Sequence, residues 1–268
     1  MTAPRTLKHA GGIFEALHRE LLGDPVELGD LDLAAHPPER IAMARRVWQE
    51  RVRTEFRSVQ IMTRFVTEVV GGGDPLEVYA GAIDLVQDEV RHVGLCAQLC
   101  QALGAPALLP DPVELRDPER YLKAPMAERA LSTAISMLAI NETISVAFVE
   151  DLRARCADPA VRRVLDATVE DEEGHQDFGW RYVEVSLARF PISSLSDWRH
   201  LVETTLAPHR AQVARILAEI APVDRELARH PEPELAALGL FSPLRQALVF
   251  ERCFEAVLRP KLAALSLL

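Results

Sequence analysis

Two short segments of the sequence combine acidic residues and a histidine in the same order. Residues Asp88–His92 read DEVRH and residues Asp171–His175 read DEEGH, so each has the pattern Asp-Glu-x-x-His. On a helix, residues three positions apart share a face, so the glutamate and histidine of each segment can bind one metal ion, or bridge two, from one side. Carboxylate oxygens with one imidazole per metal suit iron or manganese better than a structural zinc, which favours thiolates.

Each of these motifs follows an isolated glutamate on an apolar helical stripe. Glu55 precedes Glu89 by 34 residues, and Glu142 precedes Glu172 by 30 residues. Such separations fit a helix–turn–helix hairpin, in which the earlier glutamate comes level with the later motif. Two hairpins would form a four-helix bundle with one layer of metal ligands in its core. The predicted ligands are Glu55, Glu89, His92, Glu142, Glu172 and His175.

Glu142 is the most informative residue of this set. It is the only charged residue between Arg129 and Glu150, in a stretch rich in Leu, Ile, Ala and Met. A buried carboxylate without a partner is costly, so it must bind a metal, pair with an arginine, or be protonated. Metal coordination is the favoured interpretation, because the ion itself compensates the buried charge.

Other glutamates near histidines or on the same helices are predicted to be surface charges. Glu50 falls off the apolar stripe of the first long helix and lies beside two arginines, so Glu55 is the better ligand candidate. A third Glu-x-x-His match, Glu15–His18, is of a kind that chance alone produces. It lacks the preceding aspartate, and no core glutamate lies on a helix before it, so we expect no metal ligand there.

The aspartates at the start of the two motifs have two interpretations. A metal-bound histidine usually donates its second ring N–H to a carboxylate or a carbonyl. Asp88 and Asp171 are therefore predicted to accept hydrogen bonds from the motif histidines. The alternative is that both are ordinary solvent-exposed charges.

Helices are predicted along the rest of the chain. Between proline and glycine breaks the apolar residues recur with a period of 3.6, and no segment alternates as a strand would. We therefore expect an all-α protein, with a four-helix bundle over 38–190 and a helical extension over 191–268, forming one domain over 1–268. The long helices are expected at about Pro38–Val70, Pro75–Leu103, Pro125–Cys156 and Pro159–Phe190. Further helices are expected at Ile13–Leu22, Asp197–Ile220 and Ser242–Leu258.

Composition and charge restrict the class of protein. The net charge of −10 would repel phosphate backbones, so no nucleic-acid partner is expected. The longest apolar stretch, 130–149, is interrupted by Asn141 and Glu142, and no signal peptide is evident. We expect a cytoplasmic protein without a membrane partner, whose four cysteines are buried thiols. No P-loop or Gly-x-Ser-x-Gly motif competes with the metal site.

The order Glu, Glu-x-x-His, Glu, Glu-x-x-His over Pro38–Phe190 resembles the ferritin-like di-iron carboxylate superfamily. That superfamily includes bacterioferritins, rubrerythrins, ribonucleotide reductase small subunits, monooxygenases and arylamine N-oxygenases. The resemblance implies two iron ions as the cofactor, with a manganese–iron pair or two manganese ions as alternatives, and dioxygen as co-substrate. It also implies that Asp88 and Asp171 each hold the histidine on the opposite motif helix.

Several positions depart from particular members of that superfamily. Ferritins lack the second Glu-x-x-His motif, which is present here, and the CxxC iron site of rubrerythrins is absent. Thr168 stands where arylamine N-oxygenases carry an additional histidine. Val146, beside Ser145, stands where monooxygenases often carry a threonine. The resemblance therefore points to no single subfamily.

The favoured function is that of a non-haem di-iron oxidase or oxygenase, an oxidoreductase that activates dioxygen to oxidise a small organic substrate. The expected partners are that substrate, an electron donor such as a reductase or ferredoxin, and a second copy of the chain in a homodimer. One alternative is iron storage or peroxide detoxification by a ferritin-like ferroxidase. Another is a structural or regulatory protein that retains the metals without turnover.

Candidate residues for a substrate pocket lie on the same helices as the predicted ligands. They are Ser145, Val146, Thr168, Gly179, Tyr182 and Tyr79. Core packing is the simpler interpretation of the two tyrosines. The 78 residues after Phe190 contain two amphipathic helices, which are expected to close one end of the bundle beside the metals or to form a dimer interface.

Overall fold

The computed structural model describes residues 5–6, 11–23, 25–106, 108–109, 111–218 and 229–268. Within these ranges nearly all regular structure is helical, which confirms the all-α prediction. The exception is a short antiparallel pair of strands, β1 (Arg5–Thr6) and β2 (Leu108–Leu109). Two residues per strand are too few for side-chain alternation to reveal them in the sequence.

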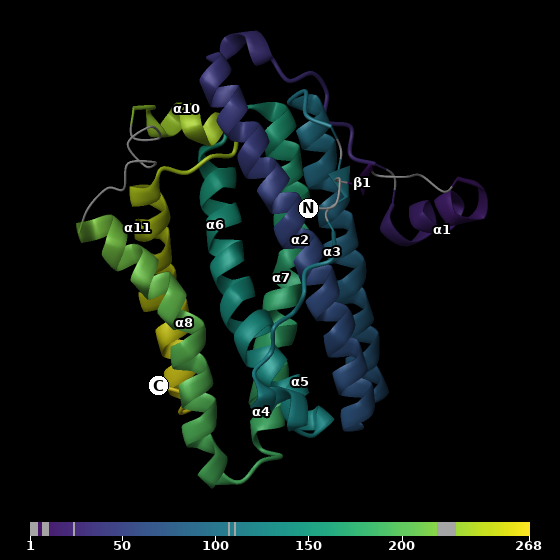
Figure 1. The fold of residues 1–268 in the computed structure, drawn as a ribbon, viewed down its shortest axis with the longest axis vertical. Helices are drawn as coiled ribbons and strands as arrows, with labels where there is room; N and C mark the ends of the chain where they lie inside the picture. The colour runs from purple at the N-terminus through teal and green to yellow at the C-terminus, as the bar shows by residue number, and fades with distance from the viewer. Residues whose placement is uncertain (1–4, 7–10, 24, 107, 110, 219–228) are drawn as a thin grey trace.

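The four long helices form within a few residues of their expected ends. They are α2 (Pro38–Gly72), α3 (Leu76–Ala102), a continuous third helix made of α5 (Met126–Thr133), η2 (Ala134–Asn141) and α6 (Glu142–Arg155), and α7 (Pro159–Leu187). Figure 1 shows them side by side, with α2 packed along α3 and α6 along α7. The helices that carry the two motifs, α3 and α7, are in contact.

Proline, glycine and a side-chain cap set the ends of these helices. Both α2 and α7 have a proline in the first turn, where the fixed φ fits and the missing N–H is not needed. Helix α2 ends at Gly73, whose φ of 72° lies in the left-handed region that favours glycine. Asp158 caps α7 by accepting hydrogen bonds from the N–H groups of Ala160 and Val161.

The third long helix differs from the sequence expectation because η2, immediately before Glu142, is a π-helix. At its end the backbone N–H of Glu142 donates to the carbonyl of Met137, five residues earlier. The side chain of Asn141 donates to the carbonyl of Ser136 at 2.7 Å, within the same wide turn. π-Helical turns are rare and are frequent at functional sites. No proline or glycine marks this stretch, so periodicity alone predicted an ordinary α-helix.

Buried apolar side chains form two clusters, with a polar layer between them. The upper cluster, towards the top of Figure 1, includes Trp48, Leu99 and Leu165, and the lower cluster includes Phe65 and Leu138. On α2, α3 and α7 the predicted ligands fall between the residues of one cluster and those of the other. The layer is therefore enclosed by apolar packing from above and below.

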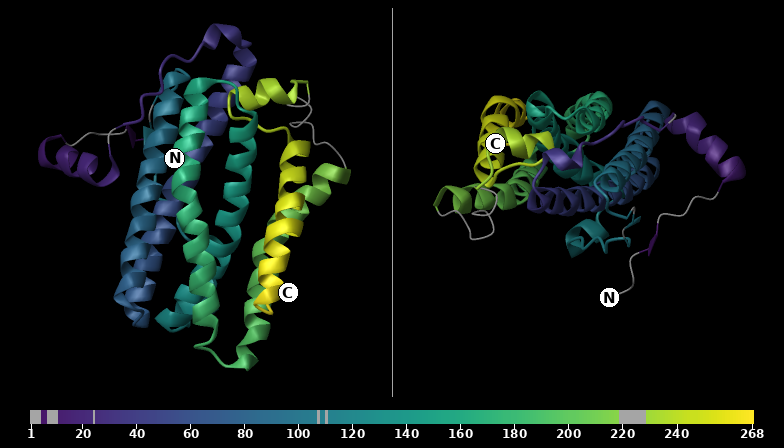
Figure 2. Two further views of the ribbon diagram at one scale, coloured as in Figure 1. Left: turned by 180° about the vertical axis from the view of Figure 1, so that it is seen from behind. Right: turned by 90° about the horizontal axis from the view of Figure 1, so that it is seen from above.

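The C-terminal helices lie along the bundle. Figures 1 and 2 show α8 (Leu195–Ala218) and α11 (Pro243–Cys253) beside the third long helix, and they contact η2 and α6. Helix α11 continues through the π-helix η4 (Phe254–Leu258) into α12 (Arg259–Ala264). This differs from the expectation that these helices close one end, where α10 (Glu232–Ala237) lies instead. Residues 219–220 of the predicted helix Asp197–Ile220 lie outside the described residues.

The N-terminal helix α1 (Gly12–Leu22) forms as predicted but has no buried residue. Figure 2 shows it projecting from the side of the bundle, and the third Glu-x-x-His match is exposed, so it lies outside the buried layer. Within it, Glu15 pairs with Arg19 at 2.7 Å. Four short helices were not predicted: η1 (Leu33–Ala35), α4 (Glu119–Lys123), η3 (Ile192–Ser194) and α10.

Among the described residues, one helical stretch is long and apolar enough to cross a membrane, by length and composition only. It is Met126–Arg155, the third long helix of the bundle. In its most apolar window, 56% of the residues are buried inside the protein. Packing against α7, α8 and α11 therefore accounts for its apolar character.

Gly179 provides a test of the close packing between α7 and η2. A Cβ at Gly179 would lie 2.5 Å from the carbonyl oxygen of Leu138, too close for any side chain. We expect Gly179→Ala to lower the free energy of unfolding by about 1–3 kcal/mol through overpacking, measured by urea denaturation. The matched control is Gly174→Ala in the same helix, where no described atom lies within 4 Å of the added Cβ. It should be neutral or stabilising by up to about 1 kcal/mol. Equal effects of the two substitutions would contradict this packing.

Candidate metal centre

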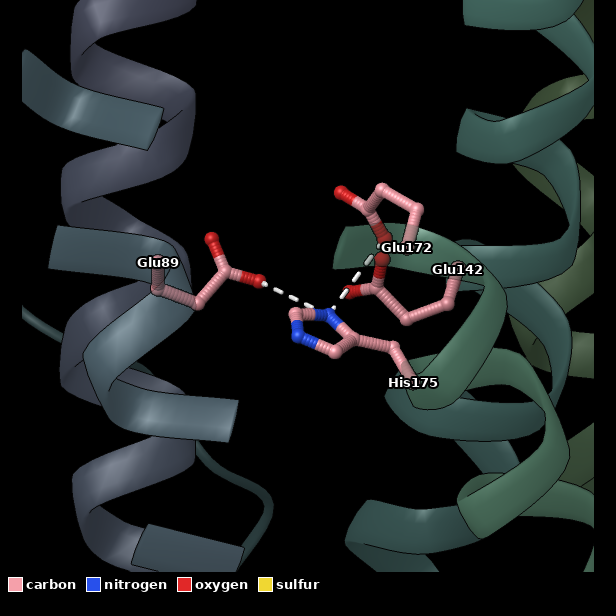
Figure 3. A group of neighbouring side chains, drawn as sticks. All are labelled: Glu89, Glu142, Glu172 and His175. Atoms are coloured by element: carbon pink, nitrogen blue, oxygen red, sulfur yellow. Dashed lines mark ion pairs between the residues drawn. The ribbon is translucent and has the colours of Figure 1, made fainter. Parts of the chain in front are cut away.

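All six predicted ligands lie together in the polar layer. One set of ligand atoms comes within 4.8 Å of one another and is drawn in Figure 3, where the side chains point into a common space: Glu89, Glu142, Glu172 and His175. A second set meets the same distance: Glu55, Glu89 and His92. Five of these side chains are buried and Glu55 is half-buried. Each Glu-x-x-His motif contributes two of them from one helix face, as the spacing requires.

Two of the glutamates, Glu89 and Glu172, lie between the two imidazoles. The Oε1 and Oε2 atoms of Glu172 are 3.5 Å from His92 Nδ1 and 3.4 Å from His175 Nδ1, respectively. Glu89 spans the same pair, with Oε2 3.9 Å from His92 Nδ1 and Oε1 3.8 Å from His175 Nδ1. Each carboxylate thus directs one oxygen to each histidine, as a carboxylate that bridges two metal ions does.

The remaining two glutamates, Glu55 and Glu142, each belong to one half of the layer. Glu55 Oε2 is 3.9 Å from His92 Nδ1. Glu142 has a ligand atom within 4.8 Å of one on His175. Each half therefore has one histidine, one glutamate of its own, and the two shared carboxylates. The layer has an approximate two-fold arrangement, with α2 and α3 supplying one half and α6 and α7 the other.

The second nitrogen of each imidazole binds the aspartate of the other motif. His92 Nε2 donates to Asp171 Oδ2 at 3.2 Å, and His175 Nε2 donates to Asp88 Oδ2 at 3.1 Å. These bonds cross between α3 and α7 and leave both Nδ1 atoms facing the glutamates. The guanidinium of Arg91 also binds Asp171, at 2.7 Å to Oδ2. Sequence analysis did not single out Arg91, although it stands inside the first motif.

Four buried atoms in this layer have no hydrogen-bond partner among the described residues. They are Glu89 Oε2, His92 Nδ1, Glu172 Oε2 and His175 Nδ1. When Nε2 carries the proton of a neutral imidazole, Nδ1 is an acceptor, so lone pairs of nitrogen and oxygen face one another. Buried acceptors without a donor are destabilising unless a proton or a cation lies between them. Divalent cations bound by these atoms would satisfy all four, so the residues fit a metal site.

Other buried carboxylates of the described chain have partners within the protein. Glu68, which sequence analysis did not notice, accepts hydrogen bonds from the hydroxyls of Tyr121 and Thr133. Asp151 is bound by three arginines. Burial of an acidic side chain is thus not what distinguishes the layer. The distinguishing feature is that its glutamates face one another and two imidazoles.

The pKa values of the metal-free layer reflect this crowding. Burial raises the pKa of Glu89 well above 4.5, and the charges of Glu142 and Glu55 raise it further. Burial also raises the pKa of Glu142 well above 4.5, and the charge of Glu172 raises it further. Burial alone would lower the pKa of His175, but its hydrogen bond to Asp88 and the neighbouring carboxylates of Glu172 and Glu142 outweigh burial and raise that pKa to about 10. Without a metal, the layer is expected to retain protons near neutral pH.

The six candidate pocket residues lie in different surroundings. Val146 lines a groove between α6, α7 and α11. Thr168 is buried and donates its hydroxyl to the carbonyl of Val164, and Gly179 packs against the backbone of η2. Tyr182 is buried and donates to Asp74, and Tyr79 packs against the lower cluster. Ser145 is half-buried on α6, and it is not among the residues that line the groove.

The raised pKa values predict how the stability of the metal-free protein depends on pH. A group whose pKa is raised by folding stabilises the fold at low pH, and that contribution is lost as the pH rises through the folded pKa. This stabilising contribution begins to be lost above pH 4.5 for Glu89 and Glu142 and above pH 6.5 for His175. For His175 the loss continues up to the folded pKa of about 10. The melting temperature of chelator-treated protein should therefore fall by roughly 5 °C or more between about pH 5.5 and about pH 9.

Glu142→Gln should flatten this dependence, whereas Glu150→Gln, an exposed glutamate on the same helix, should leave it unchanged. A melting temperature of the metal-free protein that is constant or rises over this pH range would show that burial does not raise the pKa values of these glutamates.

No protein-family model, curated protein or solved structure matches this chain. The resemblance to the ferritin-like superfamily therefore rests on the spacing of the motifs. The site is an oxygen-rich set of six side chains, five of them buried and Glu55 half-buried, that could hold metal ions.

Proposed function

We propose that this chain is a ferritin-like dimetal carboxylate protein that uses two redox-active metal ions and dioxygen to oxidise a small organic substrate. One observation carries the proposal: four glutamates and two histidines converge in one buried layer and leave four ligand atoms without a partner among the described residues. The all-helical fold, with these residues on four neighbouring helices, also supports it.

The two halves of the layer suggest which residues would hold each ion. Glu55 and His92 would bind one metal, Glu142 and His175 would bind the other, and the two shared glutamates would bridge them. Four glutamate charges would then be balanced by two divalent cations. A neutral loaded layer avoids the large penalty of burying uncompensated charge.

The chemistry of the ligands favours iron or manganese. Each ion would have three carboxylates and one imidazole, a harder set of ligands than the thiolates and imidazoles of structural zinc sites. Calcium and magnesium sites use oxygen ligands, and a histidine in each half argues against them. A pair of iron ions, a manganese–iron pair and two manganese ions all remain consistent with these residues.

Residues around the ligands would prepare the site for redox chemistry. When bound, such a metal pair supplies the chemistry of dioxygen activation. Asp88 and Asp171 would fix the tautomer and the orientation of the imidazoles, with Nδ1 towards the metals. The upper and lower clusters would keep bulk water out, which strengthens electrostatic interactions within the layer.

Metal content tests the ligand assignment. Protein from iron-rich medium, carefully desalted, should carry about two metal ions per chain by elemental mass spectrometry. Glu142→Ala should lose at least one of them, because it removes the unshared carboxylate of one half. Loss of a ligand that binds only the folded state should also lower the melting temperature.

The matched control is Glu150→Ala, which removes an exposed glutamate two turns later on α6 and should keep both ions. Wild-type protein without bound transition metal would refute the proposed centre. Full occupancy in Glu142→Ala would instead remove Glu142 from the set of ligands.

Loading with ferrous iron in air separates an oxidase from an iron-storage protein. A storage shell needs a compact subunit, whereas 78 residues follow the bundle here, and two of their helices cover its flank. We therefore expect uptake to stop at about two irons per chain, in a particle that sediments as a monomer or small oligomer. A shell-sized particle with a mineral core would overturn the oxidase proposal while leaving the metal ligands intact.

A further inference from the structure

A groove of about 770 Å³ lies between the bundle and the C-terminal helices. Its walls come from α6 and α7 on one side and from α11 and η4 on the other. Figures 1 and 2 show α11 beside α6, and both α11 and η4 contact α6. We refer to this feature as the α6–α11 groove. The metal centre proposed above makes no use of it.

Three guanidinium groups gather on one part of the groove wall. Arg155, Arg245 and Arg252 all line the groove, and all donate to the buried carboxylate of Asp151. Arg155 also pairs with Glu232, at 3.1 Å. Three positive charges thus face two negative ones. These guanidinium groups are the positive charges among the residues that line the groove.

These arginines retain donors for a ligand. Arg252 is 64% exposed and makes one hydrogen bond within the described structure, from a terminal nitrogen to Asp151 Oδ1 at 3.1 Å. Arg245 binds Asp151 through Nε and one terminal nitrogen. A guanidinium has five N–H donors, so both side chains have several left. Asp151 holds the planar groups in place, and such groups bind carboxylates with two parallel hydrogen bonds.

Small and apolar side chains line much of the remaining wall. They are Val146 and Ala147 of α6, Cys253 of α11, and Ala256 and Val257 of η4. Thr143 and Arg155 stand at the two ends of the α6 wall, and the helical rise between them is about 18 Å. An extended twelve-carbon chain fits within that length. The groove therefore combines a cationic part with an elongated apolar part.

The apolar part of the groove adjoins the metal layer. Thr143 and Gln176, which line it, directly follow Glu142 and His175 in the sequence, and Val146 lies one helical turn after Glu142. A molecule in the groove would therefore contact the same turns of α6 and α7 that hold half of the predicted ligands.

Two acidic residues, Glu150 and Asp177, also line the groove. Both are exposed, so water and salt screen their charges. Asp151, by contrast, is buried and already bound by the arginines. The guanidinium donors that a ligand could reach are therefore gathered around Asp151, where exposed Arg252 is screened by water like the two acids. The exposed acids disfavour a second anionic group elsewhere on the ligand.

We propose that the α6–α11 groove binds an amphipathic carboxylate, with its carboxylate on Arg245 and Arg252 and its apolar chain along α6 towards the metal layer. Binding itself is independent of the metals. Only the identification of this molecule class as the oxidised substrate rests on the function proposed above.

Isothermal titration calorimetry with dodecanoate, below its critical micelle concentration, tests whether the groove of the purified full-length protein binds this ligand. One molecule per chain should bind, and dodecanol should bind at least about tenfold more weakly, because hydrogen bonds to a charged group are lost. Octanoate should also bind more weakly than dodecanoate, since each methylene removed from the apolar wall costs about threefold in affinity.

Three variants locate the site. Arg252→Gln should weaken dodecanoate binding about tenfold, and Ala256→Trp, which fills the groove from an exposed position, should weaken it at least about tenfold. Arg259→Gln is the matched control, because Arg259 is 56% exposed on the next helix and does not line the groove. It should bind dodecanoate like the wild type. Circular dichroism of all three should show unchanged helicity.

The inference fails if dodecanol binds as tightly as dodecanoate, or if Arg252→Gln and Ala256→Trp bind like the control. Tighter binding of dodecyltrimethylammonium would overturn it as well, and would assign the groove to cations through its exposed acids. Metal content measured on the same samples separates the two proposals. Dodecanoate binding in metal-free protein supports the groove alone, and bound metal without dodecanoate binding supports the metal centre alone.

Discussion

The dominant physical constraint on this fold is that four glutamates, three of them buried and Glu55 half-buried, meet in one layer of a helical bundle. Like charges in a medium of low dielectric constant repel, and each carboxylate loses its hydration. Within the described chain, no ion pair joins Glu89, Glu142 or Glu172 to a lysine or arginine. The apolar clusters above and below the layer must therefore offset the free-energy cost of the repulsion among the carboxylates. Bound cations would remove this repulsion, and the free energy gained would contribute to metal affinity.

The two histidines decide what the layer can bind. Asp171 and Asp88 accept hydrogen bonds from the Nε2–H groups of the two histidines, so both Nδ1 atoms are directed to the glutamates. The aspartates thereby set the direction of each imidazole lone pair and join α3 to α7 across the layer. Protonated imidazoles could neutralise the layer only in part, since two positive charges face four carboxylates. This arithmetic favours divalent ions over protons as the pH rises.

The sequence alone was sufficient to predict the long helices and the six clustered residues, because the Asp-Glu-x-x-His motif occurs twice, each time after a glutamate on an apolar stripe. Glu68 of α2 is also buried but has no such motif beside it, and it was missed. Other features depend on contacts between distant segments. The π-helix before Glu142 has no proline or glycine, and Asn141, which binds the Ser136 carbonyl, accepts a hydrogen bond from His209 of α8. Asp151 follows Glu150 directly and looks equally exposed in the sequence, yet arginines from α11 bury it. Charged residues gain such roles only through tertiary packing.

Helix α6 links these features, because it presents functional groups on two faces. One face directs Glu142 into the polar layer, and another directs Thr143 and Asp151 to the α6–α11 groove. A surface helix of an ordinary bundle would have one polar face in water. Here the C-terminal helices cover that face, so α6 is packed between the metal layer and the groove. The π-helix that leads into α6 is bound by α8, because His209 donates a hydrogen bond to Asn141, the residue before Glu142. The C-terminal helices thus contact the turn that carries Glu142, in addition to covering the flank of the bundle.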